Sequence, residues 1–234
     1  MATVLDFPRK AIDGASAAAL APLRPFLPAG SVDEWGRDEH LIDALTPFVR
    51  LRWRAIIDGE QHLPARKGAL LVTNNRTLSF SPLSVAWSLA RLTGRPVRFI
   101  GHPDIAPLGP AMRRLGAILQ HPDEVRGALH HDELVVLGTS TTPHPRQAGR
   151  VDSAMVGAAV LAGVPVIPVA SMSSPFGRRI RVHVGAPVRP RTKRRGPLAE
   201  TELADITQHH LQRILDELGG VRTGIAPLDW VVEG

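Results

Sequence analysis

Short apolar runs alternate along the chain with longer segments of mixed polarity. The runs cover residues 68–73, 97–101, 133–137, 164–170 and 179–184. They are rich in β-branched residues and bounded by Gly or Pro, which is typical of buried strands. The segments between them are long enough for helices. The pattern therefore predicts an α/β protein with a mostly parallel central sheet flanked by helices.

Hydrophobic periodicity and helix-capping residues predict three helices, and the pattern also predicts one more short strand and one edge strand. Apolar residues recur at helical spacing over 38–53 and again over 200–218. A third helix has a good N-cap in Ser81, Pro82 at its first position and Gly94 as its stop. A short strand is expected at 55–57. In the run at 179–184, apolar residues alternate with Arg181 and His183, which predicts a half-exposed edge strand.

The length and composition suit one hydrophobic core. The 234 residues are 44% hydrophobic, which is enough for a core and favours one domain. Residues 1–35 are rich in Ala and Pro without sustained periodicity, so the prediction is an irregular N-terminal arm (1–35), one α/β domain (36–220) and a C-terminal tail (221–234). Asp6 and Asp13 interrupt the N-terminus, so no signal peptide is expected. The longest apolar run, 156–172, is broken by Gly163, Pro165 and Pro168, so no transmembrane helix is expected either. These features favour a cytoplasmic protein.

Charge favours anionic partners. The chain has 28 Lys and Arg against 22 Asp and Glu, a net charge of +6. Five basic residues and no acidic one lie in the loop 188–197: Arg189, Arg191, Lys193, Arg194 and Arg195. This loop suits peripheral contact with the anionic inner face of a membrane, with an ordinary solvated loop as the alternative. Only 4% of residues are aromatic and none is Tyr, which disfavours nucleic acid. The absence of Cys excludes disulfides and thiolate metal sites.

Ligands of parallel sheets bind at the carboxyl ends of the strands, so the loops that follow the runs are the candidate sites. Four blocks stand there in order: "LLVTNNRTLSFSP", "VRFIGHPDIAPLGPAMRRLGAIL", "LVVLGTSTTPHPR" and "GVPVIPVA". From about residue 33 to residue 188, this series resembles the glycerol-phosphate and lysophospholipid acyltransferase family (1-acylglycerol-3-phosphate acyltransferase-like). The fourth block matches the family's Val-Pro-Val-x-Pro-Val strand well.

The resemblance implies acyl transfer from acyl-coenzyme A or acyl carrier protein as co-substrate, with no bound cofactor. In the family, a His takes the proton of the acceptor hydroxyl, and an Asp that follows it after four intervening residues orients it. The matching positions hold Asn75 and Phe80, or Ser81 if the alignment slips by one residue. In the third block, Leu137 and Ser140 replace the family's Glu and Arg.

The predicted site residues follow from these blocks. The catalytic candidates are Asn75, Ser81 and His102, with Asp104 close enough in sequence to orient His102. For each a simpler alternative remains: Ser81 as a helix cap, His102 within a turn. The substrate- or phosphate-binding candidates are Arg76, Gly138, Thr139, Ser140, Arg146 and Arg150, and the arginines have a solubilising role as their alternative. His130-His131 and His209-His210 fit a solvated turn and packing, and no cluster has convincing metal spacing.

Three functions remain open from the sequence. The first is an acyltransferase-like protein of glycerolipid metabolism with weak or no transfer, because the His/Asp pair is absent. The second is a non-catalytic module, a pseudoenzyme that binds a lipid or acyl thioester. The third, a nucleic-acid-binding protein, rests on charge alone.

Overall fold

The computed structural model describes residues 32–52, 54–76, 81–101, 109–144, 146–173, 178–190 and 196–219. Its contacts divide the chain into two compact units, one with Met1–Pro47 and Gly101–Leu119 and the other with Phe48–Ile100 and Gln120–Gly234. The boundary falls within helix α2 (Glu39–Arg52). The predicted domain ends at residues 35 and 220 stay predictions.

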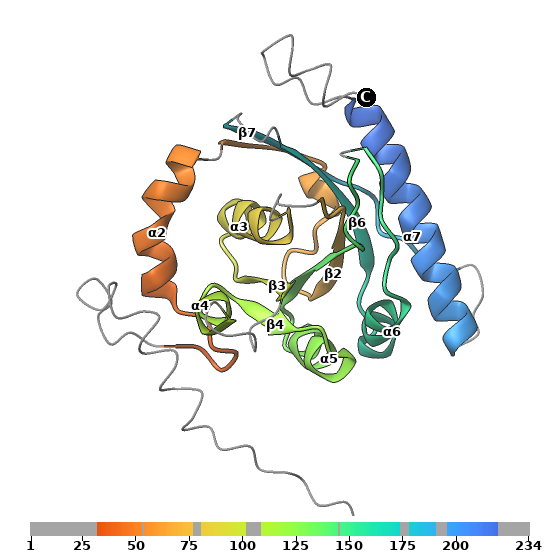
Figure 1. Cartoon of the computed structure of the whole chain (residues 1–234). Coiled ribbons are helices and arrows are strands. Elements are labelled where there is room, and N and C mark those ends of the chain that lie inside the picture. The colour runs from red at the N-terminus through yellow and green to blue at the C-terminus, as the bar shows by residue number, and fades with distance from the viewer. Residues whose placement is uncertain are drawn as a thin grey trace, which may run out of the picture. The chain divides into compact units, whose positions relative to one another are not determined.

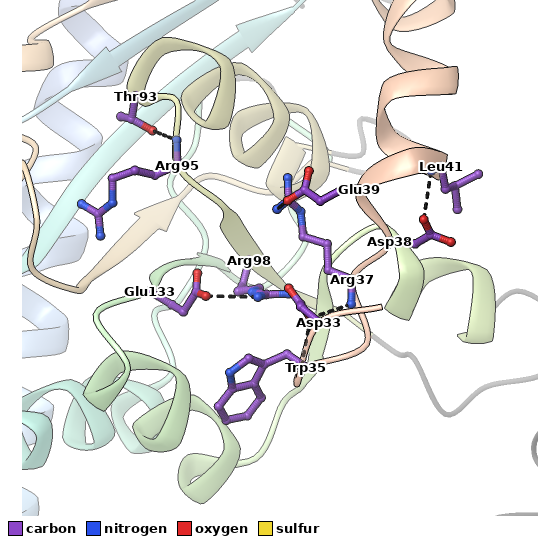
Figure 2. Close-up of polar contacts among 10 residues, drawn as sticks. All are labelled: Asp33, Trp35, Arg37, Asp38, Glu39, Leu41, Thr93, Arg95, Arg98 and Glu133. Atoms are coloured by element: carbon purple, nitrogen blue, oxygen red, sulfur yellow. Dashed lines mark hydrogen bonds and ion pairs between the residues drawn. The ribbon is translucent and has the colours of Figure 1, made fainter. Parts of the chain in front are cut away.

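The first unit holds most of α2, α4 (Gly109–Arg114) and the short strand β4 (Ala117–Leu119). Two carboxylates hold the backbone at the start of α2 (Figure 2). Asp33 Oδ1 accepts hydrogen bonds from the backbone N–H groups of Trp35 (3.0 Å) and Arg37 (2.9 Å). Asp38 Oδ1 accepts from the backbone N–H of Leu41 (3.1 Å), which satisfies a donor in the first turn of the helix.

The second unit contains the strands β1 (Arg54–Asp58), β2 (Ala69–Thr73), β3 (Val97–Gly101), β5 (Leu134–Gly138), β6 (Val166–Ser173) and β7 (Arg179–Val184). They lie in the order β1-β7-β6-β2-β5-β3. All neighbouring pairs are parallel except β6 and β7, which are antiparallel. The predicted class, α/β with a mostly parallel sheet flanked by helices, is confirmed.

Helices cover both faces of this sheet (Figure 1). α3 (Ser81–Thr93) packs on one face, and α5 (Pro122–His130), α6 (Ser153–Ala162) and α7 (Pro197–Leu218) lie side by side on the other. Every residue of β2 is buried, because strands covered on both faces need apolar side chains throughout. A short 3-10 helix, η2 (Glu60–His62), follows β1.

The predicted helices and strands match the structure closely, apart from the short strand β4, which was not predicted, and the position predicted for residues 179–184. α3 begins at Ser81 and is followed by Gly94 in the left-handed conformation (φ 64°), as the punctuation predicted. The prediction that 179–184 forms an edge strand is wrong: β7 lies between β1 and β6. Alternation along a strand reports which face is buried, and β7 has one buried face, but it says nothing about neighbours on either side.

Candidate functional site

The carboxyl ends of β2 and β5 are joined by hydrogen bonds that place Asn75 beside Thr139. Thr73 and Gly138 are register partners at the ends of these two strands. The Thr139 N–H donates to the carbonyl oxygen of Thr73 (2.8 Å), and the Asn75 N–H donates to Thr139 Oγ1 (3.2 Å). Two loops predicted to meet at this edge of the sheet therefore do so.

The pairing continues past the strand ends, through Asn75 and Arg76. The Thr142 N–H donates to the carbonyl oxygen of Asn75 (3.0 Å), and Arg76 forms a parallel bridge with Thr142. The Asn75 side chain is partly exposed, and its Nδ2 donates to Thr141 Oγ1 (3.4 Å). The Asn75 backbone is therefore held at both N–H and C=O, while its side chain makes one long hydrogen bond to the part of the chain that the structure describes.

Asn74 connects β2 to β6 from within the protein. Its side chain is buried and makes a pair of bonds to one residue: Nδ2 donates to the Ser171 carbonyl (2.9 Å), and Oδ1 accepts from the Ser171 N–H (2.8 Å). The bonds supply both backbone groups of Ser171 with partners near the end of β6. They fix the position of the carboxyl end of β6 relative to Asn75, the residue after Asn74.

We expect Asn74→Leu to lower the free energy of unfolding by about 2–3 kcal/mol, because a leucine leaves buried backbone groups of Ser171 without these partners. Asn75→Ala is the matched control, since within the described residues the neighbouring amide makes one long bond, to Thr141, and its loss should cost well under half as much. Urea unfolding followed by tryptophan fluorescence measures both. Equal losses for the two variants would contradict the structural role assigned to Asn74.

Gly138 allows β5 to approach the start of α3. A Cβ at this position would lie 2.8 Å from Pro82 Cγ and 3.4 Å from Asn75 Cβ. The contact places the first turn of α3, including the buried Ser81, next to Asn75. The Ser81 carbonyl accepts a hydrogen bond from Ser84 Oγ (3.0 Å). These residues form what we call the Asn75 site, defined as Thr73–Arg76, Ser81–Pro82, Gly138–Thr142 and Ser171–Ser173.

The loop after β5 folds back on itself at Ser140. The Ser140 N–H donates to the Arg150 carbonyl (2.8 Å), and Ser140 Oγ accepts from the Arg150 N–H (2.7 Å). A Cβ at Gly149 would lie 1.9 Å from the Ser140 carbonyl oxygen, so only glycine fits there. The Ser140 hydroxyl therefore supports the loop, in a position where the family has an arginine that binds phosphate.

Gln212 of α7 holds the same loop from outside. Its Nε2 donates to the Arg146 carbonyl (2.8 Å), and its Oε1 accepts from the Ala148 N–H (2.9 Å). Arg146 and Arg150 are exposed on this loop. Their predicted role in binding an anion stays a prediction. Arg178, which lies just before β7, donates from Nε to the Leu51 carbonyl (2.7 Å) at the end of α2.

Arg76 brings positive charge to the Asn75 site. It is half-buried, and its guanidinium donates from one terminal nitrogen to the Ser173 carbonyl (3.3 Å). Burial lowers the pKa of Arg76, although an arginine stays protonated at neutral pH. A cation with reduced hydration beside hydroxyl and amide groups suits an anionic ligand such as a phosphate.

Asn75 cannot act as a general base, because an amide does not accept a proton near neutral pH. Within the described part of the Asn75 site, the side chains are hydroxyls, amides, apolar groups and the one guanidinium. His102, Asp104 and Phe80 lie outside the described residues, as do Arg191, Lys193, Arg194 and Arg195 of the basic loop.

The histidine pairs His130-His131 and His209-His210 lie where a solvated turn and helix packing, respectively, were expected. His130 and His131 are exposed at the end of α5, before β5 begins. His210 is half-buried on α7, and burial, followed by Arg213 and His209, lowers its pKa. In the described ranges, no three His, Asp or Glu side chains gather closely enough to hold a metal ion. No helix in those ranges is long and apolar enough to cross a membrane.

Sequence reasoning missed the contacts that fix the geometry of the site. Asn74 lies in the first of the four blocks but is not among the predicted site residues, and neither are Ser171, Thr141, Thr142 and Gln212. Asn74 lies 97 residues from its partner Ser171. The one signal that could have found the pair is the parallel register of β2 and β6, which a single sequence does not display.

No protein-family model matches the chain, and no curated protein matches it in sequence. Its structure is similar to the crystal structure of the 1-acyl-sn-glycerophosphate (LPA) acyltransferase PlsC from Thermotoga maritima. The match covers 90% of this chain and 93% of that chain, with a TM-score of 0.57 and 19% sequence identity. The family resemblance expected from the four blocks is thereby confirmed at the level of the fold, and the protein is acyltransferase-like in its architecture.

Proposed function

We propose that this acyltransferase-like protein binds an acyl thioester or an anionic lysophospholipid at the Asn75 site and transfers acyl groups weakly or not at all. The observation that carries the proposal is the amide of Asn75, which stands where the family has its proton acceptor. Loss of a general base lowers a rate by roughly 10²–10⁴. Binding does not need that base.

Three features support retained binding. Arg76 supplies a half-buried cation at the carboxyl edge of the sheet. The hydrogen bonds of Thr139, Thr142 and Asn74 hold the surrounding loops in place, which lowers the entropy lost when a ligand binds. Gly138 and Gly149 keep the loop after β5 close to the strand ends. The described part of the site therefore contains a cation that can hold an anionic ligand. It contains no side chain that can act as a general base near neutral pH.

A second candidate function is active acyl transfer with His102 as the substitute base. The observation that favours this alternative is that His102 follows β3 in sequence, and β3 is parallel to β5. The carboxyl ends of parallel strands meet at one edge of a sheet. In that case, His102 would take the proton of the acceptor hydroxyl while the hydroxyl oxygen attacks the thioester carbonyl. The C–S bond would then break, and the sulfur would leave as a thiol with the proton that His102 returns. The two functions differ in turnover and not in binding.

The test measures binding of palmitoyl-coenzyme A and of lysophosphatidic acid to the purified protein by calorimetry, with mass spectrometry of lipid that co-purifies. We expect micromolar binding, and Arg76→Gln should weaken it about tenfold, because a hydrogen bond to a charged group contributes about 1.5–3 kcal/mol. Arg126→Gln is the control, since Arg126 is exposed on α5, where it forms an ion pair with Asp123 of the same helix (3.3 Å). No binding of either ligand and no bound lipid would contradict the proposal.

A further inference from the structure

Strand β1 forms one edge of the sheet, and its outer side has no partner strand among the described residues. β7 lies along its inner side, and of the described elements only β7 contacts β1 extensively. Arg54, Ala55 and Asp58 of this strand are exposed, and so is Ile56, at 48%. An exposed edge with free backbone groups is a template on which another strand can pair. β1 is therefore a candidate interaction surface.

The outer edge of β1 presents the backbone groups of Ala55 and Ile57. In a parallel pair, alternate residues of a strand direct both N–H and C=O toward the neighbouring strand, and the residues between them point these groups the other way. The Arg54 N–H donates to the carbonyl of the residue before β7. Ile56 and Asp58 follow with the same period, so they also face β7. Ala55 and Ile57 therefore direct their donors and acceptors outward.

The sequence of β1, RAIID, is complementary to itself when it is read in the opposite direction. In an antiparallel pair of two β1 strands centred on Ile56, Arg54 of each copy lies opposite the partner's Asp58, which joins opposite charges. In the same pair, Ala55 lies opposite the partner's Ile57. These are the residues whose backbone groups point outward, so they exchange the hydrogen bonds of an antiparallel ladder. A shift of the register by two residues in either direction loses the charge pairing.

A second copy also supplies negative charge where β1 and β7 bring positive charges together. Their register places Arg54 directly beside Arg179. Like charges side by side on neighbouring strands are unfavourable. Within the described part of the chain, neither Arg54 nor Asp58 has an ion-pair partner. The partner's Asp58 would offset the repulsion between Arg54 and Arg179.

We infer that two copies of this chain associate through β1, in an antiparallel pair with two-fold symmetry about Ile56. The two sheets then become one continuous sheet, with the Ile56 side chains in contact across the axis and an Arg54–Asp58 ion pair on each side of them. A strand of another protein would need this charge pattern in reverse, whereas a second copy supplies it by symmetry. One pair of five-residue strands is a small interface, so we expect weak association, with Kd of about 10–100 µM.

This arrangement leaves both Asn75 sites open. Ser173, at the end of β6, is the register partner of Ile180, and Arg179 beside it is the partner of Arg54. The start of β1 therefore lies at the edge of the sheet that carries the site. Because β1 of the second copy runs in the opposite direction, the two sites lie at opposite edges of the joined sheet. Association through β1 therefore neither covers nor requires a ligand at the Asn75 site.

Sedimentation equilibrium of the purified chain, from about tenfold below to about tenfold above the expected Kd, tests this inference by charge exchange. Asp58→Arg places two arginines opposite each other, and Arg54→Asp places two carboxylates opposite each other, so each should weaken the dimer about tenfold or more. The double variant Arg54→Asp, Asp58→Arg restores opposite charges and should restore the dimer. An equimolar mixture of the two single variants should form a mixed dimer. Asp123→Arg, at an exposed position of α5, is the control with the same change of charge.

Cysteine cross-linking tests the register itself. The chain has no cysteine, so Ile56→Cys introduces one thiol per copy. Directly opposite residues of a non-hydrogen-bonded antiparallel pair have Cα atoms about 4.5 Å apart, which a disulfide can span. Ile56→Cys should therefore give a covalent dimer under mild oxidation. Ala55→Cys is the matched control and should give little, because diagonal neighbours lie about 7–8 Å apart.

Several results would overturn the inference. One is a monomer at every concentration, and another is a dimer that Asp58→Arg and Asp123→Arg weaken equally. Failure of the double exchange to recover the dimer, or preferential cross-linking of Ala55→Cys, would also contradict it, since the copies would then meet through another surface or register. Ile56→Cys changes no charge, so the test stands if a charge variant fails to fold. Palmitoyl-coenzyme A binding by Asp58→Arg should equal that of the unsubstituted protein, and it reports separately on the proposed function.

Discussion

Acyl transfer from palmitoyl-coenzyme A to lysophosphatidic acid should rise roughly 10²–10⁴-fold when Asn75→His and Phe80→Asp are combined, because a general base and its orienting carboxylate return together. The structure favours this exchange at position 75. The Asn75 backbone is held by Thr139 and Thr142, whatever the side chain, and among the described residues the amide gives up one long bond, to Thr141. A histidine there keeps the loop and gains a proton acceptor.

The controls for this gain are the two single variants and a shifted pair. Asn75→His alone should gain less, because no carboxylate sets the tautomer and direction of its ring. Asn75→His with Ser81→Asp tests the alignment that slips by one residue, and Ser81 is buried at the start of α3 next to the site. If both pairs bind palmitoyl-coenzyme A normally yet stay at the unsubstituted rate, the missing proton acceptor does not explain weak transfer.

The second large effect is expected at a buried ion pair in the core of the second unit. Arg98 of β3 is 1% exposed, and one of its terminal nitrogens lies 3.1 Å from Glu133 Oε1, whose side chain is 16% exposed (Figure 2). Removing one partner of such a pair costs about 3–5 kcal/mol, because the remaining charge stays away from water. We expect Glu133→Leu to cost about 3 kcal/mol, since Glu133 is not fully buried.

Two comparisons isolate this effect in urea unfolding curves. Asp123→Ala removes the exposed partner of Arg126 and should change the free energy of unfolding by less than about 1 kcal/mol. Arg98→Met combined with Glu133→Leu should recover most of the loss, because an apolar pair of similar volume needs no ion partner. A cost for Glu133→Leu no larger than for Asp123→Ala would show that the pair contributes little.

The strands were predictable because their signal is local. Residues 69–72 and 166–170 are apolar without interruption, which is the pattern of a strand covered on both faces. β4 was missed because it has three residues, too few to show a period. The place of β7 in the sheet was predicted wrongly because lateral order depends on pairing between distant segments, which alternation does not report.

The position of the candidate site was predictable, but its internal contacts were not. Parallel strands bring their carboxyl ends to one edge, so the meeting of Asn75 with Gly138 and Thr139 followed from strand assignment alone. The bonds of Asn74 to Ser171 and of Gln212 to Ala148 depend on register and on how α7 lies against the loop. Those are properties of tertiary packing, in which residues 64 to 97 positions apart become neighbours.

The central claim is that the Asn75 site binds its ligand without efficient transfer. The most direct test uses one preparation each of the unsubstituted protein and of His102→Ala. In each preparation, palmitoyl-coenzyme A binding is measured together with thiol release in the presence of lysophosphatidic acid. The account predicts binding by both proteins and, in both, thiol release at or near the background rate. Release well above background that His102→Ala abolishes, with binding retained, would contradict it and identify His102 as the base.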